Sequence, residues 1–287
     1  MLNFFFRFSS IFKKTKDIFY IENDNQFLIA KEVISKEKLL GLDTEFDWRN
    51  TYFPVLSMLQ ISTPKSIFLF DCLNCKNIDS LKCILEDENK IIIFHAARSD
   101  TTVLSSNLNI KIKNAFDIQV AEKLINSGDI KSYSSIVLKY FGKILDKSET
   151  NSNWLRRPLN ENQISYAASD VEFLLDIFKF QRKNLLKINK LKNAFELSQK
   201  EAYFGNRDIK LSRLERNKYK LSKREKEIFL WREDMAKLEN IPTSFLFKDK
   251  YLKKLSRLKG NDSNLKSQII KILGDTKLTE NFISNFF

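Results

Sequence analysis

Two carboxylates, Asp43 and Glu45, are the residues whose types and spacing most clearly suggest chemistry. They stand at the end of the apolar segment Leu39–Asp43, which has the character of a β-strand. Because residues i and i+2 of a strand point to the same face, both carboxylates should aim at one place beside buried sheet. Two like charges repel each other there unless a cation compensates them, and hard oxygen ligands suit Mg²⁺ or Mn²⁺. The pair indicates a divalent-metal site, with ordinary turn chemistry at a strand end as the alternative.

Two further acids and a tyrosine extend this candidate site. Asp100 follows the β-branched segment Ile91–Phe94, near the start of the next helix. Asp170 lies in a helical segment, four residues after Tyr166, so the two side chains share one helical face. Residues 167–169 are small and would let backbone or substrate approach that face. An aspartate is unfavourable in the middle of a helix without a partner, so Asp170 indicates a functional role.

A sheet followed by helices should position these residues. Apolar and β-branched runs predict strands, and three of them follow one another closely, as antiparallel neighbours do. The run KIIIF is continuously apolar after its lysine, which is typical of a strand buried on both faces. Together these segments predict an α/β core with mixed strand directions. The expected strands are Phe19–Glu22, Leu39–Asp43, Val55–Ser62, Ile67–Asp71 and Lys90–Phe94, and the expected helices span 24–35 with Asp24 as the cap, 78–85, 98–106, 117–126 with Asp117 as the cap, 132–141 and 160–185.

From about residue 186 the pattern changes, because strand signals end and the periodicity becomes helical throughout. Ser222 and Glu225 form a capping box that opens a helix through Leu238. One face of this helix should pack in a core. We place a domain boundary near residue 208. The residues on the expected core face are Ile228, Trp231, Met235 and Leu238, and shorter helices are expected near 248–258, 263–273 and 277–286.

The chain has 287 residues, which corresponds to about two domains, and its formal net charge is +13. Such an excess favours a polyanionic partner, most simply nucleic acid. Codon bias is the alternative, because the sequence has 37 Lys and only 12 Arg beside much Asn, Ile and Phe. The charge is concentrated, however, since residues 206–287 hold 20 Lys plus Arg against 11 Asp plus Glu. That concentration favours a helical domain that binds nucleic acid over a bias spread along the chain.

The sequence argues against several other classes of protein. No stretch reaches the roughly 18 apolar residues that span a bilayer, so we expect a soluble protein. Cys72, Cys75 and Cys83 should be reduced thiols, since a zinc site would lack a second ligand pair and His95 is the only histidine. Residues 1–16 are basic and read as an N-terminal extension, with a transit-like or membrane-surface segment as the alternative.

Three motifs resemble the DEDD superfamily of 3′→5′ exonucleases. DTEF at 43–46 is similar to the first exonuclease motif, HAARSD at 95–100 to the second and YAASD at 166–170 to the third, with the Tyr-x-x-x-Asp spacing of the tyrosine branch. Residues 145–175 resemble the corresponding segment of the bacterial ribonuclease D family, although Asn153 stands where that family commonly has an aspartate. The C-terminal segment WREDMAKLENIP resembles a helical HRDC domain.

The resemblance implies a ribonuclease H-like mixed sheet flanked by helices, followed by a small all-helical HRDC-like domain. It divides the chain into three parts. These are an N-terminal extension at 1–18, an exonuclease domain with a connecting helix at 19–207, and an HRDC-like nucleic-acid-binding domain at 208–287.

The resemblance also implies a catalytic site with two divalent metal ions, Mg²⁺ or Mn²⁺. Asp43 would bridge both ions, and Glu45 and Asp170 would complete one of them. Asp100 would serve the other ion. Tyr166 would orient the attacking water, since a free tyrosine has a pKa near 10 and is a poor base. Substrate contacts are expected from Phe46, Gln60, Trp154, Arg156 and Arg157.

Each of these substrate contacts has an alternative. Gln60 could reach the terminal nucleotide or make a cross-strand hydrogen bond. Trp154 could stack on a base or anchor its loop to the core, whereas Arg156 and Arg157 could hold phosphate. Phe46 could lie beside the terminal base or pack in the core.

The resemblance predicts an exoribonuclease that removes nucleotides one at a time from RNA 3′ ends and releases nucleoside 5′-monophosphates. It implies tRNA precursors as substrates and the cytoplasm as the location, with no membrane and no obligate protein partner. A 3′→5′ DNA exonuclease is the alternative enzyme, because the same carboxylates serve either sugar and a contact to the 2′-hydroxyl would distinguish them. A non-catalytic nucleic-acid-binding module is a third hypothesis, against which the converging acids argue.

Overall fold

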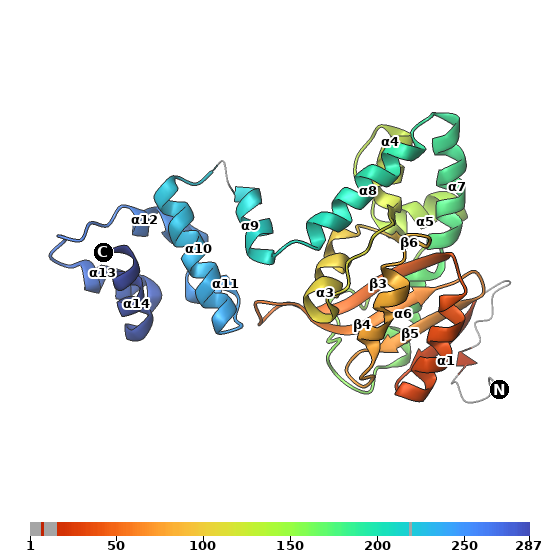
Figure 1. Cartoon of the computed structure of the whole chain (residues 1–287), viewed down its shortest axis with the longest axis horizontal. Coiled ribbons are helices and arrows are strands. Elements are labelled where there is room, and N and C mark those ends of the chain that lie inside the picture. The colour runs from red at the N-terminus through yellow and green to blue at the C-terminus, as the bar shows by residue number, and fades with distance from the viewer. Residues whose placement is uncertain (1–6, 9–15, 218–219) are drawn as a thin grey trace. The chain divides into compact units, whose positions relative to one another are not determined.

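The computed structural model describes residues 7–8, 16–217 and 220–287 of the chain (Figure 1). The chain forms two compact units. The first unit runs to Asp47 and continues from Pro54 to Arg207, and the second unit contains Trp48–Phe53 and Asp208–Phe287. The segment from Trp48 to Phe53 therefore belongs to the second unit although it follows a strand of the first, which corrects the predicted assignment of all of 19–207 to one domain.

The first unit is built on a mixed sheet that has seven strands within the described residues, in the order β1-β2-β5-β4-β3-β6-β7. The neighbours β3, β4 and β5 are antiparallel, as predicted, whereas β6 and β7 continue the sheet in parallel with β3. Helices cover both faces, which confirms the predicted α/β class. The strands are β1 (Arg7–Phe8), β2 (Asp17–Ile21), β3 (Leu39–Asp47), β4 (Val55–Ser62), β5 (Ser66–Asp71), β6 (Ile91–Phe94) and β7 (Ala115–Asp117).

Strand β3 is longer than its apolar segment, because it continues through the acidic residues to Asp47. Along this length it pairs with β4, so that Asp43 lies opposite Gln60. On its other edge β3 pairs with β6 only as far as Gly41. Beyond Gly41 that edge of β3 has no strand partner among the described residues, so the acidic part of the strand lies where the sheet opens.

Most helices of the first unit form where the sequence predicts them, with two differences. The cap of α1 is Asn23, which has the extended backbone that a cap needs and accepts a hydrogen bond from the backbone N of Gln26 (3.1 Å); Asp24 is the first helical residue. The long helix predicted at 160–185 is two helices that meet at Phe173. Asp117 caps α4, as predicted. The helices are α1 (Asp24–Ser35), η1 (Ile78–Leu81), α2 (Lys82–Leu85), α3 (Arg98–Leu108), α4 (Ile118–Asn126), α5 (Tyr133–Phe141), α6 (Glu161–Glu172), α7 (Leu174–Lys187) and α8 (Leu191–Gly205).

The buried residues of the first unit form two clusters, one on each face of the sheet. The first cluster joins the sheet to α1, α2 and α3, and the second joins it to α4, α5, α6 and α7. Strand β6 contributes to both, because Ile92 and Phe94 belong to the first cluster and Ile93 to the second. The prediction of a strand buried on both faces is therefore confirmed, and the sheet has packed support on each side.

The second unit is helical within the described residues. The predicted capping box of Ser222 and Glu225 opens its longest helix, α10. The short segment α11, which follows Pro242, was not predicted. The helices are α9 (Ile209–Asn217), α10 (Lys223–Leu238), α11 (Thr243–Leu246), η2 (Asp249–Tyr251), α12 (Leu252–Ser256), α13 (Leu265–Leu273) and α14 (Thr276–Phe286).

Three of the four residues predicted on the core face of α10 pack inward. Ile228 and Trp231 are buried in the core of the second unit, and Met235 packs against it. Leu238 is 71% exposed instead, because α10 ends there, beyond the part of the helix that the core covers. Tyr52, from the segment that follows β3, is also buried in this core, which explains why that segment belongs to the second unit.

The N-terminal extension predicted at 1–18 lies only partly within the described residues. Arg7–Phe8 pairs antiparallel with β2, and β2 itself begins at Asp17, so these parts of the segment belong to the sheet. Residues 1–6 and 9–15 lie outside the described residues. In the described part of the chain, every helix is too short or too polar to cross a membrane.

Candidate metal centre

Three carboxylates from two elements converge in the first unit. One carboxylate oxygen from each of Asp43, Glu45 and Asp170 lies within 4.8 Å of the other two. Asp43 and Glu45 stand two residues apart on β3, and Asp170 comes from α6, which packs against β3. Such a set of hard oxygen donors can hold a divalent metal ion. The structure thus brings together the acids of the first and third motifs.

Small residues let α6 come close to the sheet. Ala167 is fully buried and Ala168 nearly so, and both belong to the core cluster on that face. The hydroxyl of Ser62 on β4 donates a hydrogen bond to the carbonyl oxygen of Val171 on α6 (2.8 Å). The small alanine side chains therefore let the helix pack closely against the sheet, and they are not exposed to a substrate. This close packing brings Asp170 to β3.

Asp100 adjoins the three converging acids from α3. It is 3% exposed, and one of its carboxylate oxygens accepts a hydrogen bond from Thr44 Oγ1 (2.7 Å). Besides burial, the charge of Asp100 raises the pKa values of Asp43, Glu45 and Asp170, so it is close enough to interact with all three. Thr44 was not predicted as a site residue, because its contact with Asp100 spans 56 residues of the chain.

The four acids have raised pKa values because they lie close together in a partly buried site. Burial is the largest cause at each acid, and repulsion from neighbouring carboxylates adds to it. The pKa of Glu45 is raised to about 9, and those of Asp100 and Asp170 to about 7. The pKa of Asp43 is raised well above its ordinary value. All four groups can be ionised at neutral pH only if positive charge compensates them, and a divalent cation supplies that charge.

These raised pKa values predict how pH affects the metal-free protein. Above the ordinary carboxylate pKa of about 4, the folded state keeps protons that the unfolded chain has lost, so stability falls as pH rises. In a chelating buffer, the free energy of unfolding should decrease by about 1 kcal/mol or more between about pH 5 and pH 9. Urea denaturation at the two pH values measures this difference.

Glu45→Gln is the matched variant for this measurement, because it removes the carboxyl group whose pKa is raised to about 9. Its loss of stability over the same pH interval should be smaller than that of the parent protein. Mg²⁺ at the higher pH should restore stability to the parent, since a ligand that binds the folded state stabilises it. Equal losses in the parent and the variant would contradict the raised pKa of Glu45.

Tyr166 lies one helical turn before Asp170 on α6. Its hydroxyl is 3.3 Å from Thr150 Oγ1, and its hydrogen bond to Asp170 partly offsets the rise in the pKa of that acid. Burial, followed by the charge of Asp170, raises the pKa of Tyr166 above its ordinary value. The hydroxyl therefore stays protonated at neutral pH, and it can orient a water molecule by hydrogen bonding but cannot act as a base.

Trp154 anchors its loop to the core. It is 3% exposed and belongs to the same core cluster as α6. Its ring centroid lies 6.0 Å from that of Tyr166, and its carbonyl oxygen accepts a hydrogen bond from the Ser57 hydroxyl. Of the two alternatives for Trp154, the structure supports the anchor, because a buried indole has no face to offer to a base.

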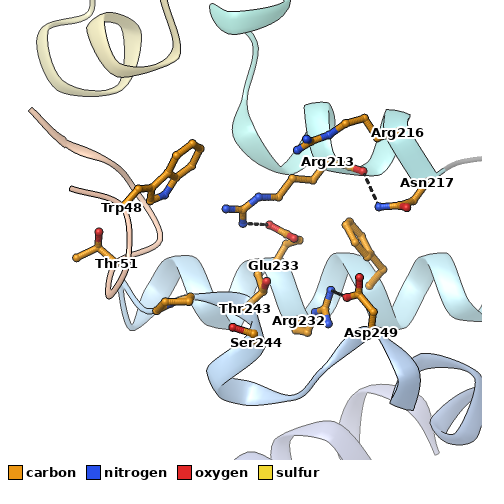
Figure 2. A pocket seen from close by; sticks show the side chains of 12 residues that line it. Trp48, Thr51, Arg213, Arg216, Asn217, Arg232, Glu233, Thr243, Ser244 and Asp249 are labelled. Atoms are coloured by element: carbon orange, nitrogen blue, oxygen red, sulfur yellow. Dashed lines mark hydrogen bonds and ion pairs between the residues drawn. The ribbon is translucent and has the colours of Figure 1, made fainter. Parts of the chain in front are cut away.

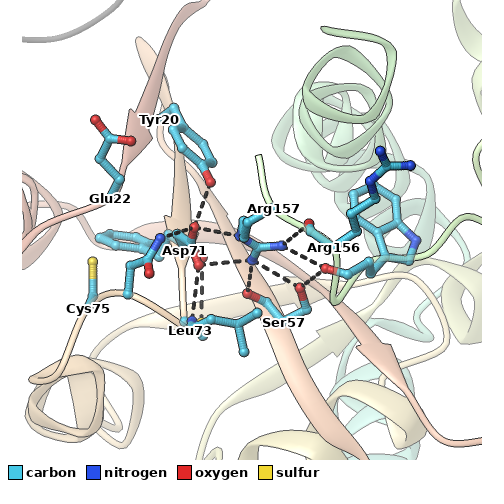
Figure 3. Close-up of polar contacts among 12 residues, drawn as sticks. Tyr20, Glu22, Ser57, Asp71, Leu73, Cys75, Arg156 and Arg157 are labelled. Carbon is cyan, nitrogen blue, oxygen red and sulfur yellow. Dashed lines mark hydrogen bonds and ion pairs between the residues drawn. The ribbon is translucent and has the colours of Figure 1, made fainter. Parts of the chain in front are cut away.

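Arg157 was predicted to hold phosphate, but it forms an ion pair with a buried acid instead (Figure 3). Its Nε and Nη2 donate to the two carboxylate oxygens of Asp71, at 2.6 and 2.9 Å, and Asp71 is fully buried. Tyr20 donates a further hydrogen bond to Asp71 (2.7 Å). Burial opposes the ionisation of Asp71, but the hydrogen bonds from Arg157 and Tyr20 outweigh it and lower the pKa. Of the two arginines predicted to hold phosphate, Arg156 is the exposed one.

Gln60 and Phe46 both lie beside the acids of β3. Gln60 is opposite Asp43 and fully buried, and its amide atoms have no hydrogen-bond partner within the described residues. A cross-strand hydrogen bond is therefore wrong for Gln60, whose neighbour on β5 is the apolar Leu69. Phe46 follows Glu45 at a β-bulge and is partly exposed.

Asp117 holds the loop that joins β6 to α3. Its carboxylate accepts hydrogen bonds from the backbone N of Ala96 (3.1 Å) and Ala97 (2.9 Å). Ala96 has a φ of 62°, a left-handed conformation that these bonds support. His95 Nε2 lies 3.0 Å from the carbonyl oxygen of Lys131 and is outside the acid cluster. The loop role of Asp117 adds to its predicted role as a helix cap.

Known proteins are similar to this chain along most of its length. The model of a 3′-5′ exonuclease family matches residues 18–186. Ribonuclease D of Desulfotalea psychrophila is 30% identical over 80% of this chain and 64% of its own length, and that of a Shewanella strain is 27% identical over 83% and 63%. The crystal structure of Escherichia coli RNase D, described as an exoribonuclease involved in structured RNA processing, superposes with a TM-score of 0.80 at 25% identity, covering 93% of this chain and 74% of that one. The chain spans less than two thirds of the length of these two curated relatives.

Proposed function

Because the chain belongs to the 3′-5′ exonuclease family, we propose that it is a metal-dependent 3′→5′ exoribonuclease. It would remove nucleotides one at a time from RNA 3′ ends and release nucleoside 5′-monophosphates. The observation that carries this proposal is the convergence of Asp43, Glu45 and Asp170, with Asp100 beside them. A protein that only bound nucleic acid would gain nothing from four acids that repel one another and repel phosphate.

The acids would act as metal ligands. Two divalent ions, Mg²⁺ or Mn²⁺, would stabilise the charge on the attacking and leaving oxygens of the phosphodiester. Asp43 would serve both ions, Glu45 and Asp170 would hold one of them with it, and Asp100 would serve the other. Thr44 would keep Asp100 in place through its 2.7 Å hydrogen bond, which also supports the ionised form of that acid.

Tyr166 would orient the attacking water. Its protonated hydroxyl and its position one turn before Asp170 support this role. Trp154 and Thr150 contact Tyr166 and would act as positioning residues, since they fix the ring and the hydroxyl respectively. The buried pair of Arg157 and Asp71 would hold the loop that carries Trp154.

Tyr166→Phe should lower kcat by about a hundredfold, because it removes one hydrogen-bond donor at the reacting centre. The Mg²⁺ concentration that gives half-maximal activity should change little, since the four carboxylates remain. Tyr203→Phe is the matched control, because Tyr203 is 60% exposed and lies on α8. A large shift in the Mg²⁺ requirement of Tyr166→Phe would count against the water-orienting role and favour a role in metal binding.

RNA as the substrate class rests on the relatives and on charge. The curated relatives are ribonucleases D, and the E. coli structure is described as acting on structured RNA. The excess of basic residues in 206–287 would attract the phosphate backbone of such an RNA. We further propose tRNA precursors in the cytoplasm as the substrates, which is what the resemblance of residues 145–175 to the ribonuclease D family implies.

The second unit would hold the RNA as an HRDC-like domain. Its helical structure and the HRDC-like segment at 231–242 support this assignment. Phe46 would contact the terminal nucleotide, because it is partly exposed beside the acids of β3. The amide of Gln60 is fully buried, so this residue would support the strand of the acids from behind rather than contact the nucleotide. Arg156 would contact a phosphate from its exposed position.

The direction of digestion and the product test this proposal. RNA labelled at its 5′ end should shorten one nucleotide at a time, and RNA labelled in its last nucleotide should release that nucleotide first, as a 5′-monophosphate. A block on the 3′ end should stop both reactions. Release of short oligonucleotides, or digestion of RNA with a blocked 3′ end, would indicate an endonuclease and contradict the proposal.

A further inference from the structure

The second unit contains a cavity of about 420 Å³ that the proposed exonuclease site does not use (Figure 2). All its lining residues belong to that unit. Arg213 and Arg216 extend toward it from α9, and Trp48 lines it from the segment that follows β3. Its volume lies within the range of ligand-binding pockets. Arginines and a tryptophan around one cavity suit phosphate and base recognition.

The charges around the cavity leave one arginine uncompensated. Arg213 pairs with Glu233 (3.1 Å), and Arg232 pairs with Asp249 (2.6 Å). Among the residues that the structure describes, none forms an ion pair with Arg216, which is exposed. The cavity therefore has a net positive charge, and the guanidinium of Arg216 is available to an anion.

Further hydrogen-bond donors belong to residues that line the cavity. The Nε of Arg232 is buried and has no hydrogen-bond partner within the described residues, although its other nitrogens bind the carbonyl of Phe247 and the carboxylate of Asp249. Thr243 and Ser244 add two hydroxyl groups to the lining. The buried Nε is closed to solvent, so the two hydroxyl groups are the donors that an oxygen-rich ligand in this cavity can reach.

Trp48 is held in place at the cavity. Its indole Nε1 donates a hydrogen bond to the carbonyl oxygen of Tyr52 (2.8 Å). The guanidinium of Arg213 lies 5.5 Å from the centroid of the Trp48 ring and 5.1 Å from that of Tyr52. Because Tyr52 is buried in the core of the second unit, the ring of Trp48 has fixed support. A fixed and partly exposed ring can stack on a base at low cost in conformational entropy.

We propose that this cavity binds one nucleotide of a single-stranded RNA segment, with its phosphodiester at Arg216 and its base at Trp48. This inference rests on the proposed function, because it assumes that the polyanion is RNA. Trp48 follows Glu45 by three residues, so the segment that carries it is continuous with the strand of the acid cluster. The site would therefore let the second unit bind the RNA at a specific nucleotide, in addition to the general attraction between its basic residues and the RNA backbone.

Arg216→Gln tests the phosphate contact. Binding is measured by fluorescence anisotropy with a labelled single-stranded RNA whose 3′ end is blocked, in chelating buffer at several KCl concentrations. The variant should bind about tenfold more weakly than the parent, and its salt slope should fall by about 0.7, as expected for one lost contact to a single strand. Arg257→Gln is the matched control, because it removes the same charge from an exposed position outside the cavity lining.

Trp48→Leu tests the base contact, with Trp48→Phe as its matched variant because phenylalanine keeps an aromatic face. The leucine variant should bind RNA about tenfold more weakly than the phenylalanine variant. Thermal melting of both variants shows whether the second unit keeps its core. Equal affinities of the two variants would overturn the placement of a base at Trp48.

Arg216→Gln and Arg257→Gln with the same affinity and the same salt slope would overturn the phosphate site. Because binding is measured without metal ions, this result does not depend on catalysis. A parent protein that failed to hydrolyse RNA would count against the proposed function alone, whereas the loss of binding in Arg216→Gln would still be visible.

Discussion

Asp43→Asn should reduce metal-dependent exonuclease activity by about a thousandfold or more, and Asp170→Asn should do the same. Each change removes one negative ligand from a set whose oxygens lie within 4.8 Å of one another, which should empty a metal position. Charge stabilisation at the reacting phosphate is the main source of rate in this kind of site, so its loss has a large effect. The initial rate of nucleotide release from 3′-labelled RNA, with Mg²⁺ or Mn²⁺, measures the loss.

The fold should survive these substitutions. Because burial and repulsion raise the pKa of Asp43, its replacement by a neutral residue of similar shape should leave the metal-free protein at least as stable as the parent. Asp79→Asn is the matched control, since Asp79 is an exposed acid of the first unit, and it should leave activity unchanged. If Asp43→Asn or Asp170→Asn released nucleotides at the parent rate, the assignment of that acid as a ligand would be wrong.

Arg157→Leu should lower the free energy of unfolding by about 3–5 kcal/mol. The variant leaves the buried carboxylate of Asp71 without the guanidinium that donates two hydrogen bonds to it. A buried charge without a partner is among the most costly defects in a folded protein. Urea denaturation of the parent and the variant measures the difference.

The neighbouring arginine provides the control for Arg157→Leu. Arg156 is exposed, so Arg156→Leu should change the free energy of unfolding by no more than about 0.5 kcal/mol. Combining Arg157→Leu with Asp71→Leu should recover much of the loss, because both members of the buried pair are then apolar. The account of this ion pair would fail if Arg157→Leu and Arg156→Leu had the same effect.

The core of the candidate site could be predicted because its spacing is local. Asp43 and Glu45 stand two residues apart on a strand, and Tyr166 and Asp170 stand four apart on a helix, so secondary structure alone places each pair on one face. Five of the seven described strands were predicted for the same reason, since their apolar runs are short and continuous. The short strands β1 and β7 were not predicted, because two or three residues give too little pattern. The prediction of Asp100 as a site residue also needed the resemblance to the exonuclease motif. Asp100 is far from β3 along the chain, so the sequence pattern alone does not show that the two are close in space.

The residues whose roles the sequence did not determine depend on contacts between distant parts of the chain. Arg157 pairs with Asp71, which lies 86 residues away, and no local pattern distinguishes it from the exposed Arg156. The sequence is equally consistent with Trp154 stacking on a base and with Trp154 anchoring its loop, and only the burial of the indole distinguishes the two roles. Thr44 acts through Asp100, 56 residues away, so its hydroxyl carries no local signal.

The loop after β3 changes how the second unit should be tested. Deleting residues 206–287 would seem a direct test of their basic charge, but Tyr52 is buried in the core of the second unit and donates a hydrogen bond to Glu233 (2.9 Å). The deletion would therefore expose Tyr52 and leave its hydroxyl without this partner. Single substitutions such as Arg216→Gln keep that core intact and separate charge from folding.

The most direct test of the central proposal compares RNA and DNA of the same sequence, each with a free or a blocked 3′ end, in Mg²⁺, in Mn²⁺ and in chelator. We predict release of mononucleotides from RNA with a free 3′ hydroxyl in the presence of either divalent ion, and none in chelator. Faster digestion of the matched DNA would contradict the assignment as an exoribonuclease, and binding without any hydrolysis would contradict the assignment as an enzyme.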